Sequence, residues 1–259
     1  MLRTVAGQNV WVTQTGHGPL RIFVHCSFGQ SRTLMPLADL LPPGRNVFFD
    51  LPGHGKSAPW VGDNYHSDVL GIVDELADEP AHVIGHSFGA TVALRLAIEQ
   101  PHRVARLTLI EPVMFAAAKD ARALSVHRAA FSPFVSAMEN GDLEKASELF
   151  VSMWGTGPSW PNLSKRRRDR IISQIHLIPA AASVIEDDEP KLADRLENVS
   201  CIVDLIEGST SQPIMSAILD GLEATIPHVN RTCVQGADHM VPITHAKDVA
   251  RAIANSKRP

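Results

Sequence analysis

A serine enclosed by glycines is the residue of this chain most suited to covalent chemistry. Gly85–Gly89 reads Gly-His-Ser-Phe-Gly, a Gly-x-Ser-x-Gly pattern. A short apolar run, Ala81–Ile84, precedes it, and Ala90–Gln100, long enough for about three helical turns, follows it. A serine at such a sharp strand-to-helix turn is held clear of the sheet, and glycine leaves room for the turn. The pattern predicts that Ser87 is a nucleophile.

A serine hydroxyl is a poor nucleophile at neutral pH and needs an adjacent base that an acid orients. Of the twelve histidines, His239 is the best candidate, because its loop follows the last expected strand and returns to the sheet edge that holds the serine. We expect His86 to point elsewhere, and His25 and His54 to hold neighbouring loops by hydrogen bonds. The histidines show no metal-binding spacing, which argues against a metal site.

The elements that position these residues are short apolar runs alternating with helical patterns. Strands that alternate with helices indicate a mostly parallel sheet covered on both faces. The expected strands are Val10–Thr15, Arg21–His25, Asn46–Asp50, Ala81–Ile84, Arg106–Glu111, Cys201–Ile206 and Arg231–Gln235, and the expected helices include Tyr65–Asp78, Ala90–Gln100, Ile214–Ala224 and Ile243–Ile253.

Residues 113–198 break this rhythm, because they contain helical patterns and no strand-like run. We expect them to form a helical cap inserted into a core made of residues 1–112 and 199–259. The basic run Lys165–Arg170 could bind an anion, although such a run is more typical of the solvated face of a helix.

Composition favours a soluble cytoplasmic enzyme with a small-molecule substrate. The 259 residues are 44% hydrophobic and 20% charged, and the net charge of −4 does not favour nucleic acid or an anionic membrane as a partner. The sequence has no apolar stretch of membrane-spanning length and begins without a signal-peptide core. Cys26, Cys201 and Cys233 lie far apart, and we expect buried, reduced thiols.

Four segments, taken together and in order, resemble the α/β-hydrolase superfamily. They are His25–Gly29, Asp50–Ser57, Gly85–Gly89 and Gly236–His239, which match its oxyanion, fourth-strand, nucleophile and histidine loops. The resemblance covers the chain apart from the insertion. It implies an α/β-hydrolase fold, with a mostly parallel central sheet flanked by helices and an inserted helical cap.

The resemblance also implies an oxyanion hole. The family uses the backbone N–H of the residue after the nucleophile, here Phe88, and a second N–H from the loop after the third strand, here Ser27. That loop departs from the family in having Cys26 where glycine is common, which bears on the shape of the loop. We expect Cys26 to be a packed thiol rather than a reactive one.

The triad acid is not where most relatives have it. At the usual aspartate position this chain has Ser211, which cannot hold a negative charge. Some branches of the superfamily place the acid after the strand beyond the nucleophile helix, and Glu111 stands there, in the family's order of serine, acid and histidine. Glu111 is therefore the predicted acid, with Asp204 or Glu207 as alternatives.

These residues predict a serine hydrolase, without cofactor or metal, that cleaves an ester or lactone of a small, mainly apolar carbonyl compound. The same machinery leaves open hydrolysis of a carbon–carbon bond in a diketone-like ring-cleavage product, or cofactor-free peroxidase chemistry. A non-catalytic ligand-binding protein on this fold is the alternative from a different class. The residues expected to line the substrate pocket are Trp154, Trp160, Met114 and Phe115.

Overall fold

A single sheet organises the chain. The computed structural model describes residues 1–155 and 157–256, and within them eight strands lie in the order β1-β2-β4-β3-β5-β6-β7-β8. The edge strand β1 pairs antiparallel with β2, β2 also pairs antiparallel with β4, and the other neighbours are parallel. The strands are β1 (Leu2–Val5), β2 (Gln8–Thr15), β3 (Leu20–Val24), β4 (Arg45–Phe49), β5 (Ala81–His86), β6 (Val104–Ile110), β7 (Ile202–Gly208) and β8 (Val229–Val234).

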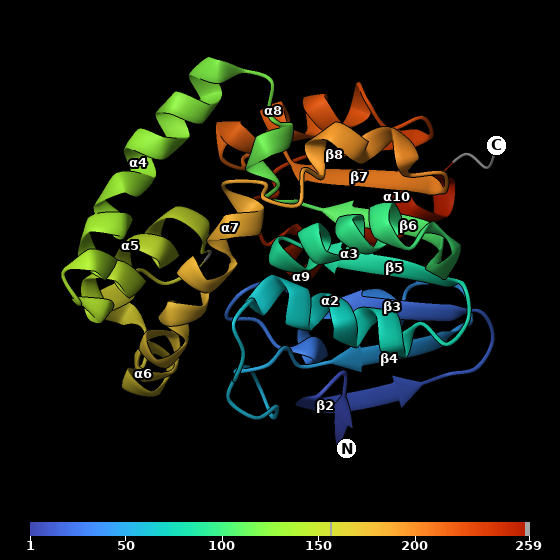
Figure 1. Cartoon of the computed structure of the whole chain (residues 1–259), viewed down its shortest axis with the longest axis horizontal. Helices are drawn as coiled ribbons and strands as arrows, with labels where there is room; N and C mark the ends of the chain where they lie inside the picture. Colours follow the sequence, from blue (N-terminus) through green and yellow to red (C-terminus); the bar gives the residue numbers. More distant parts are fainter. Residues whose placement is uncertain (156, 257–259) are drawn as a thin grey trace.

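Helices cover both faces of the sheet (Figure 1). Successive strand residues point to opposite faces, and β5 shows this, because Val83 belongs to one apolar cluster and Ile84 to the other. The first cluster includes residues of α2 (Tyr65–Leu76), α3 (Phe88–Glu99) and α8 (Pro213–Glu223). The second includes residues of α1 (Met35–Ala38), α9 (Val241–Thr244) and α10 (Ala246–Asn255). Burying each aliphatic side chain in these layers contributes about 1.5–3 kcal/mol.

The strand register brings the ends of the central strands level with one another. His86 at the end of β5 pairs with Ile110 at the end of β6, and Ile110 pairs with Ile206 of β7. The ladder continues one residue further, since the Ser87 N–H donates to Ile110 O (2.9 Å) and the Glu111 N–H donates to Ile206 O (2.8 Å). The residues that follow β5 and β6 therefore lie side by side at one edge of the sheet.

The segment between β6 and β7 is helical and lies to one side of the sheet in Figure 1. Its α-helices are α4 (Ala121–Glu139), α5 (Leu143–Trp154), α6 (Lys165–Gln174) and α7 (Ala182–Ile185). Side-chain caps begin the first three, because Asp120, Asp142 and Ser164 each accept a hydrogen bond from a first-turn backbone N–H. Short 3₁₀ turns occur in the chain at Ser31–Leu34, Pro101–Arg103, Phe115–Ala117, Trp160–Asn162, Ile175–Leu177, Pro179–Ala181 and Ala193–Asn198.

Helix α4 continues through Pro133, which lacks the N–H that would bond to the Ala129 carbonyl. The Ser132 hydroxyl donates to Ala129 O at 3.0 Å and satisfies that carbonyl instead. This local exchange explains why a proline is tolerated in the middle of a long helix.

Each apolar run expected to be a strand does form one, which confirms the expected mostly parallel sheet between helices. The sequence reading missed β1, and its last expected helix is two helices, α9 and α10, separated by a non-helical His245. Thr156 of the expected insertion and residues 257–259 of the expected core lie outside the described residues. In the ranges that the structure describes, we find no helix with the length and apolar character needed to span a membrane.

Candidate active site

Ser87 stands at a strained turn between β5 and α3. Its backbone is in a left-handed region, with φ of 55° and ψ of −118°, which costs a non-glycine residue on the order of 1–3 kcal/mol. The flanking glycines are required by space, because a Cβ on Gly85 would lie 2.3 Å from Gly89 O and a Cβ on Gly89 would lie 2.2 Å from Val24 O. Ser87 as a whole is 7% exposed and lines a cavity.

His239 reaches Ser87 from the loop after β8. Its Nε2 lies 2.9 Å from Ser87 Oγ, and its backbone carbonyl accepts a hydrogen bond from His86 Nε2 at 2.8 Å. Burial lowers the pKa of His86 to about 3, so its ring is neutral and acts as a fixed support for the loop. Neighbouring Asp238 turns away and accepts the Met240 N–H.

Glu111 lies on the other side of the imidazole. Its Oε2 is 3.0 Å from His239 Nδ1, and its Oε1 accepts hydrogen bonds from the Gly208 N–H and the Ser211 hydroxyl, both at 2.7 Å. The residue is 0% exposed and has a φ of 51°. A buried carboxylate needs such partners, because an unpaired charge is very costly in an apolar interior. Ser211, at the usual acid position, thus supports the carboxylate on the neighbouring strand.

The two alternative acids are engaged elsewhere. Asp204 forms a 2.8 Å ion pair with Arg106, and Glu207 forms a 2.7 Å ion pair with Arg231. Glu111 supplies the carboxylate that contacts His239.

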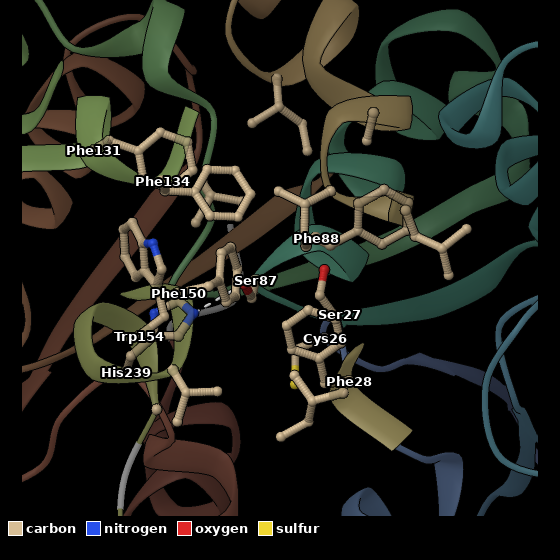
Figure 2. Close-up of a pocket in the computed structure, with 18 of the residues that line it drawn as sticks. Cys26, Ser27, Phe28, Ser87, Phe88, Phe131, Phe134, Phe150, Trp154 and His239 are labelled. Carbon is tan, nitrogen blue, oxygen red and sulfur yellow. Dashed lines mark hydrogen bonds between the residues drawn. The ribbon is translucent and has the colours of Figure 1, made fainter. Parts of the chain in front are cut away.

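The loop after β3 lies beside Ser87. Ser27 and Phe88 both line the same cavity as Ser87 (Figure 2). The N–H of Phe28 donates to His54 Nε2 at 3.0 Å and the N–H of Ser87 is bonded within the sheet, so neither is free to bind a ligand. The backbone N–H groups of Ser27 and Phe88 are the remaining candidates for donors to an oxyanion.

Two buried histidines hold this loop, as the sequence led us to expect. His25 Nε2 accepts the Leu51 N–H at 2.9 Å, and His54 links the backbone of Phe28 to that of Pro52. Burial lowers the pKa of His25 to about 4 and that of His54 to about 3, so both rings are neutral at pH 7.

Cys26 fits this loop without strain, because the left-handed residue there is Phe28 (φ 58°) and not Cys26. The Cys26 thiol is buried, and burial raises its pKa to about 12, which agrees with an unreactive packed thiol. The expectation of burial was wrong for the other cysteines, since Cys201 is half-buried and Cys233 is exposed.

The cavity has a volume of about 580 Å³ and lies between the sheet and the helical segment. Apolar side chains make most of its wall, and Trp154 lies against the ring of His239, with 4.9 Å between ring centroids (Figure 2). The aromatic residues that line it are Phe28, Phe88, Phe115, Phe131, Phe134, Phe150 and Trp154.

Two of the four residues predicted for the pocket line this cavity, Phe115 and Trp154, and two do not. Met114 is fully buried in the main apolar core, and Trp160 packs with Leu163 and Ile171 instead. The sequence reading missed several residues on α4, His127, Phe131 and Phe134. Their spacing of four and three residues places them on one helix face, a signal that was available.

The basic run forms α6, and most of it is solvated. Lys165 pairs with Asp169 at 2.7 Å on the exposed face, whereas Arg167 and Arg170 reach the wall of the cavity. Over residues 1–155 and 157–256, no group of three or more histidine, cysteine or carboxylate side chains is arranged to hold a metal ion.

A family model and a curated relative match the chain along most of its length. A family model described as "Alpha/beta hydrolase family" matches residues 22–252. A pimeloyl-[acyl-carrier protein] methyl ester esterase of Chromobacterium violaceum is 25% identical over 95% of this chain and 97% of that protein. A 2-hydroxymuconate semialdehyde hydrolase of Pseudomonas sp. is 38% identical over 84 residues, which cover 30% of this chain and 29% of that protein.

Two other curated relatives match less than half of the chain, and a solved structure matches its fold. The acetyltransferase component of the acetoin cleaving system of Cupriavidus necator is 38% identical over 46% of this chain and 30% of that protein. Lipase LipV of Mycobacterium tuberculosis is 39% identical over 38% of this chain and 39% of that protein, so the chain spans less than half the length of either relative. The solved structure of an esterase from Exiguobacterium antarcticum aligns with a TM-score of 0.74 at 14% identity, covering 98% of this chain and 97% of that one. At this identity the likeness concerns the fold.

Proposed function

The chain belongs to the alpha/beta hydrolase family, and from that premise we propose that it is a serine hydrolase acting on an ester or lactone of a small, mainly apolar carbonyl compound. One observation supports this proposal most strongly. Ser87, His239 and Glu111 form a continuous hydrogen-bonded chain, with links of 2.9 and 3.0 Å, that begins in an apolar cavity. This is the geometry that turns a serine hydroxyl into a nucleophile.

In the first step, Ser87 Oγ attacks the substrate carbonyl carbon while His239 Nε2 accepts the hydroxyl proton. The carbonyl π electrons move to oxygen, and the backbone N–H groups of Phe88 and Ser27 stabilise the resulting oxyanion. Phe88 is the first residue of α3, where the positive end of the helix dipole adds to this stabilisation. Loss of one such donor costs about 3 kcal/mol of transition-state stabilisation.

In the second step, the carbonyl re-forms and the bond to the leaving alcohol breaks, with the proton on His239 Nε2 going to the leaving oxygen. The product is an acyl group on Ser87. A water molecule then attacks this acyl group, with His239 again accepting a proton and returning it to Ser87, so the carboxylic acid leaves and the enzyme is restored.

Glu111 acts through His239. Its carboxylate holds the proton on Nδ1, so Nε2 is the nitrogen that faces Ser87, and its negative charge stabilises the imidazolium formed in each step. The bonds from Gly208 and Ser211 fix the second carboxylate oxygen, so the carboxylate is already oriented before substrate binds.

We further propose that residues 113–198 act as a cap, and that Phe115 and Trp154 contact the substrate. The aromatic wall of the cavity suits an apolar acyl or alcohol group. Exclusion of water beneath the cap would strengthen the electrostatic interactions at the oxyanion.

The proposal is tested by hydrolysis of p-nitrophenyl acetate, pentanoate and octanoate by the wild type and by Ser87→Ala. We expect turnover by the wild type and a loss of about 10⁴-fold or more in Ser87→Ala. A folded wild type that hydrolyses none of these esters, nor a lactone panel, would favour the ligand-binding alternative.

Carbon–carbon bond hydrolysis is the second candidate, because one relative is named as a 2-hydroxymuconate semialdehyde hydrolase. The serine, histidine and acid would keep their places, and the leaving group would be a carbanion that takes up a proton. A vinylogous 1,5-diketone in the same assay panel distinguishes the two. Faster cleavage of the diketone than of every ester would replace the ester proposal.

A further inference from the structure

One histidine lies deep in the mainly apolar wall that the helical segment contributes to the cavity. His127 of α4 is only 6% exposed and lines the cavity. Its Nε2 is buried and is among the described side-chain atoms that have no hydrogen-bond partner in the protein. Buried polar atoms are nearly always paired, so this atom calls for a ligand.

Aromatic rings surround His127 and hold it in place. Its ring stacks on Phe115, with centroids 4.3 Å apart and planes 19° apart, and on Phe131 at 5.7 Å. The edge of Trp154 meets it at 5.8 Å. These rings fix the orientation of the imidazole without offering its nitrogens a conventional hydrogen bond.

The imidazole is neutral. Burial, with a smaller contribution from the nearby Arg128 guanidinium, lowers the pKa of His127 to about 4. A neutral imidazole has one N–H donor and one acceptor nitrogen, so it can bind a carbonyl or a hydroxyl oxygen. It therefore suits an uncharged oxygen, which can accept from the ring N–H or, in a hydroxyl, donate to the other ring nitrogen.

His127 is also close to the reacting centre. Trp154 separates it from His239, with ring centroids 5.8 Å from His127 and 4.9 Å from His239 (Figure 2 shows Trp154 against His239). An acyl chain whose carbonyl is at Ser87 and which runs along Trp154 would bring an atom a few carbons away to His127.

The other polar groups of this wall are closer to solvent. The exposed ones are Arg128, Ser132, Ser136 and Arg167, and the half-buried ones are Arg170 and Glu186. Burial raises the pKa of Glu186 to about 7. Water reaches part of each of these side chains, so they gain less than His127 from an uncharged partner on the substrate. Arg170 Nε is also buried without a partner among the described residues, but its guanidinium carries a positive charge, which favours an anion.

We infer that His127 is a specificity-determining residue that hydrogen-bonds an uncharged oxygen, a ketone or a hydroxyl, on the acyl part of the substrate a few carbons from the scissile carbonyl. This inference rests on the proposed hydrolase function and sharpens it. The preferred substrates are short esters with an oxygenated acyl chain, ahead of plain alkyl esters of the same length.

The test compares p-nitrophenyl pentanoate with p-nitrophenyl 4-oxopentanoate, which differ by one ketone oxygen. We expect the wild type to prefer the keto ester in kcat/KM by about fivefold, the value of one hydrogen bond. His127→Phe and His127→Leu should bring the ratio close to one by slowing the keto ester, and His127→Gln, which keeps a donor and an acceptor, should retain part of the preference. Ser125→Ala, on the exposed side of α4, is the matched control and should keep the wild-type ratio.

A wild-type ratio that persists in folded His127→Phe or His127→Leu overturns the inference and leaves the hydrolase proposal intact. If no ester is hydrolysed, a binding measurement tests the inference about His127 separately from the hydrolase proposal. In Ser87→Ala, titration with ethyl pentanoate and ethyl 4-oxopentanoate, followed by tryptophan fluorescence, should show tighter binding of the keto ester, and adding His127→Leu should remove that difference. Equal binding of both esters before the second substitution also overturns the inference.

Discussion

Two regions of the molecule meet at the cavity, and they are held in different ways. On the sheet side, Ser87 and Glu111 follow adjacent strands whose register is fixed by backbone hydrogen bonds. Both have positive φ, so the sheet holds them in conformations that non-glycine residues rarely adopt. On the helical side, side-chain packing between α4 and α5, as between Phe134 and Phe150, shapes the wall.

This difference separates chemistry from selection. A hydrogen-bonded register holds the reacting atoms in place, and catalysis requires this because a misplacement of about 1 Å can slow a reaction about 10²-fold. Packed helices can change their side chains and keep their place, so the wall can be adapted to a substrate without disturbing the reacting groups. Substitutions on the sheet side should therefore slow all substrates alike, and those on the helical side should change which substrate is preferred.

The largest effect is expected for Glu111→Gln. The substitution keeps the shape but removes the charge that stabilises imidazolium, and it can favour the wrong imidazole tautomer. We expect kcat for p-nitrophenyl esters to fall about 10⁴-fold, with equal losses for short and long acyl chains.

Asp204→Asn and Glu207→Gln are the matched controls, because each removes a buried carboxylate charge that is paired with an arginine. Both should retain kcat when folded, although each leaves an arginine without its partner and lowers stability. If either one, rather than Glu111→Gln, abolished turnover, our choice of acid would be wrong.

The second largest effect is expected from acid, which should lower the free energy of unfolding because the sheet side contains buried histidines. The pKa values of His25, His54 and His86 are lowered to about 4, 3 and 3, mainly by burial, against an ordinary value of 6.5. Below pH 6.5 the unfolded chain takes up protons that the folded protein does not. The contribution of these neutral rings to the free energy of unfolding is therefore fully present above pH 6.5, and it is lost as the pH falls toward their folded-state pKa values of about 3 to 4. By about pH 5 each histidine should cost about 2 kcal/mol of unfolding free energy.

Urea unfolding at about pH 7 and about pH 5 measures this loss. His54→Gln should lessen the pH dependence, and His228→Gln, at an exposed position, should not. A free energy of unfolding that stays constant over this range would contradict the buried, neutral state of these rings.

On the helical side, Phe131→Ala should alter the choice of substrate. Removing this ring from the cavity wall takes away contacts that a longer acyl chain would make. We expect kcat/KM for p-nitrophenyl octanoate to fall about tenfold relative to kcat/KM for the acetate, which is the size of effect that one or two methylenes produce. Equal changes for both esters would mean that the wall does not select.

The smallest effect is expected for Ser211→Ala. Glu111 Oε1 would lose one of its two donors and keep the Gly208 N–H, so kcat should fall about fivefold. Ser209→Ala on the same loop is the control, because its hydroxyl accepts the Gly236 N–H and does not contact Glu111. Equal losses in the two variants would point to a loosened loop rather than to Glu111.

The sequence predicted most of the sheet because its strands are short apolar runs between helical patterns. Strand β1 escaped notice because Leu2–Val5 is mostly exposed and lies at the edge, where burial imposes no apolar pattern. The chain order of Ser87, Glu111 and His239 could be read from motifs. The strained turn at Glu111 and the two donors on its Oε1 could not, because they arise from contacts with residues about one hundred positions away.

The cavity wall was harder to predict, since tryptophan alone does not distinguish a lining residue from a packed one. Trp154 and Trp160 are both large, apolar and in the helical segment, yet only Trp154 faces the cavity. That outcome depends on how α5 and the turn at Trp160–Asn162 pack, which no local pattern specifies. Helical spacing of His127, Phe131 and Phe134 was the more informative signal.

Labelling with a fluorophosphonate tests the central claim most directly, because only an activated serine attacks such a probe. We predict a covalent adduct that peptide mass spectrometry locates on Ser87, with no adduct in Ser87→Ala and much slower labelling in His239→Ala and Glu111→Gln. No adduct on folded wild-type protein, or an adduct that forms equally fast without the carboxylate of Glu111, would contradict the account.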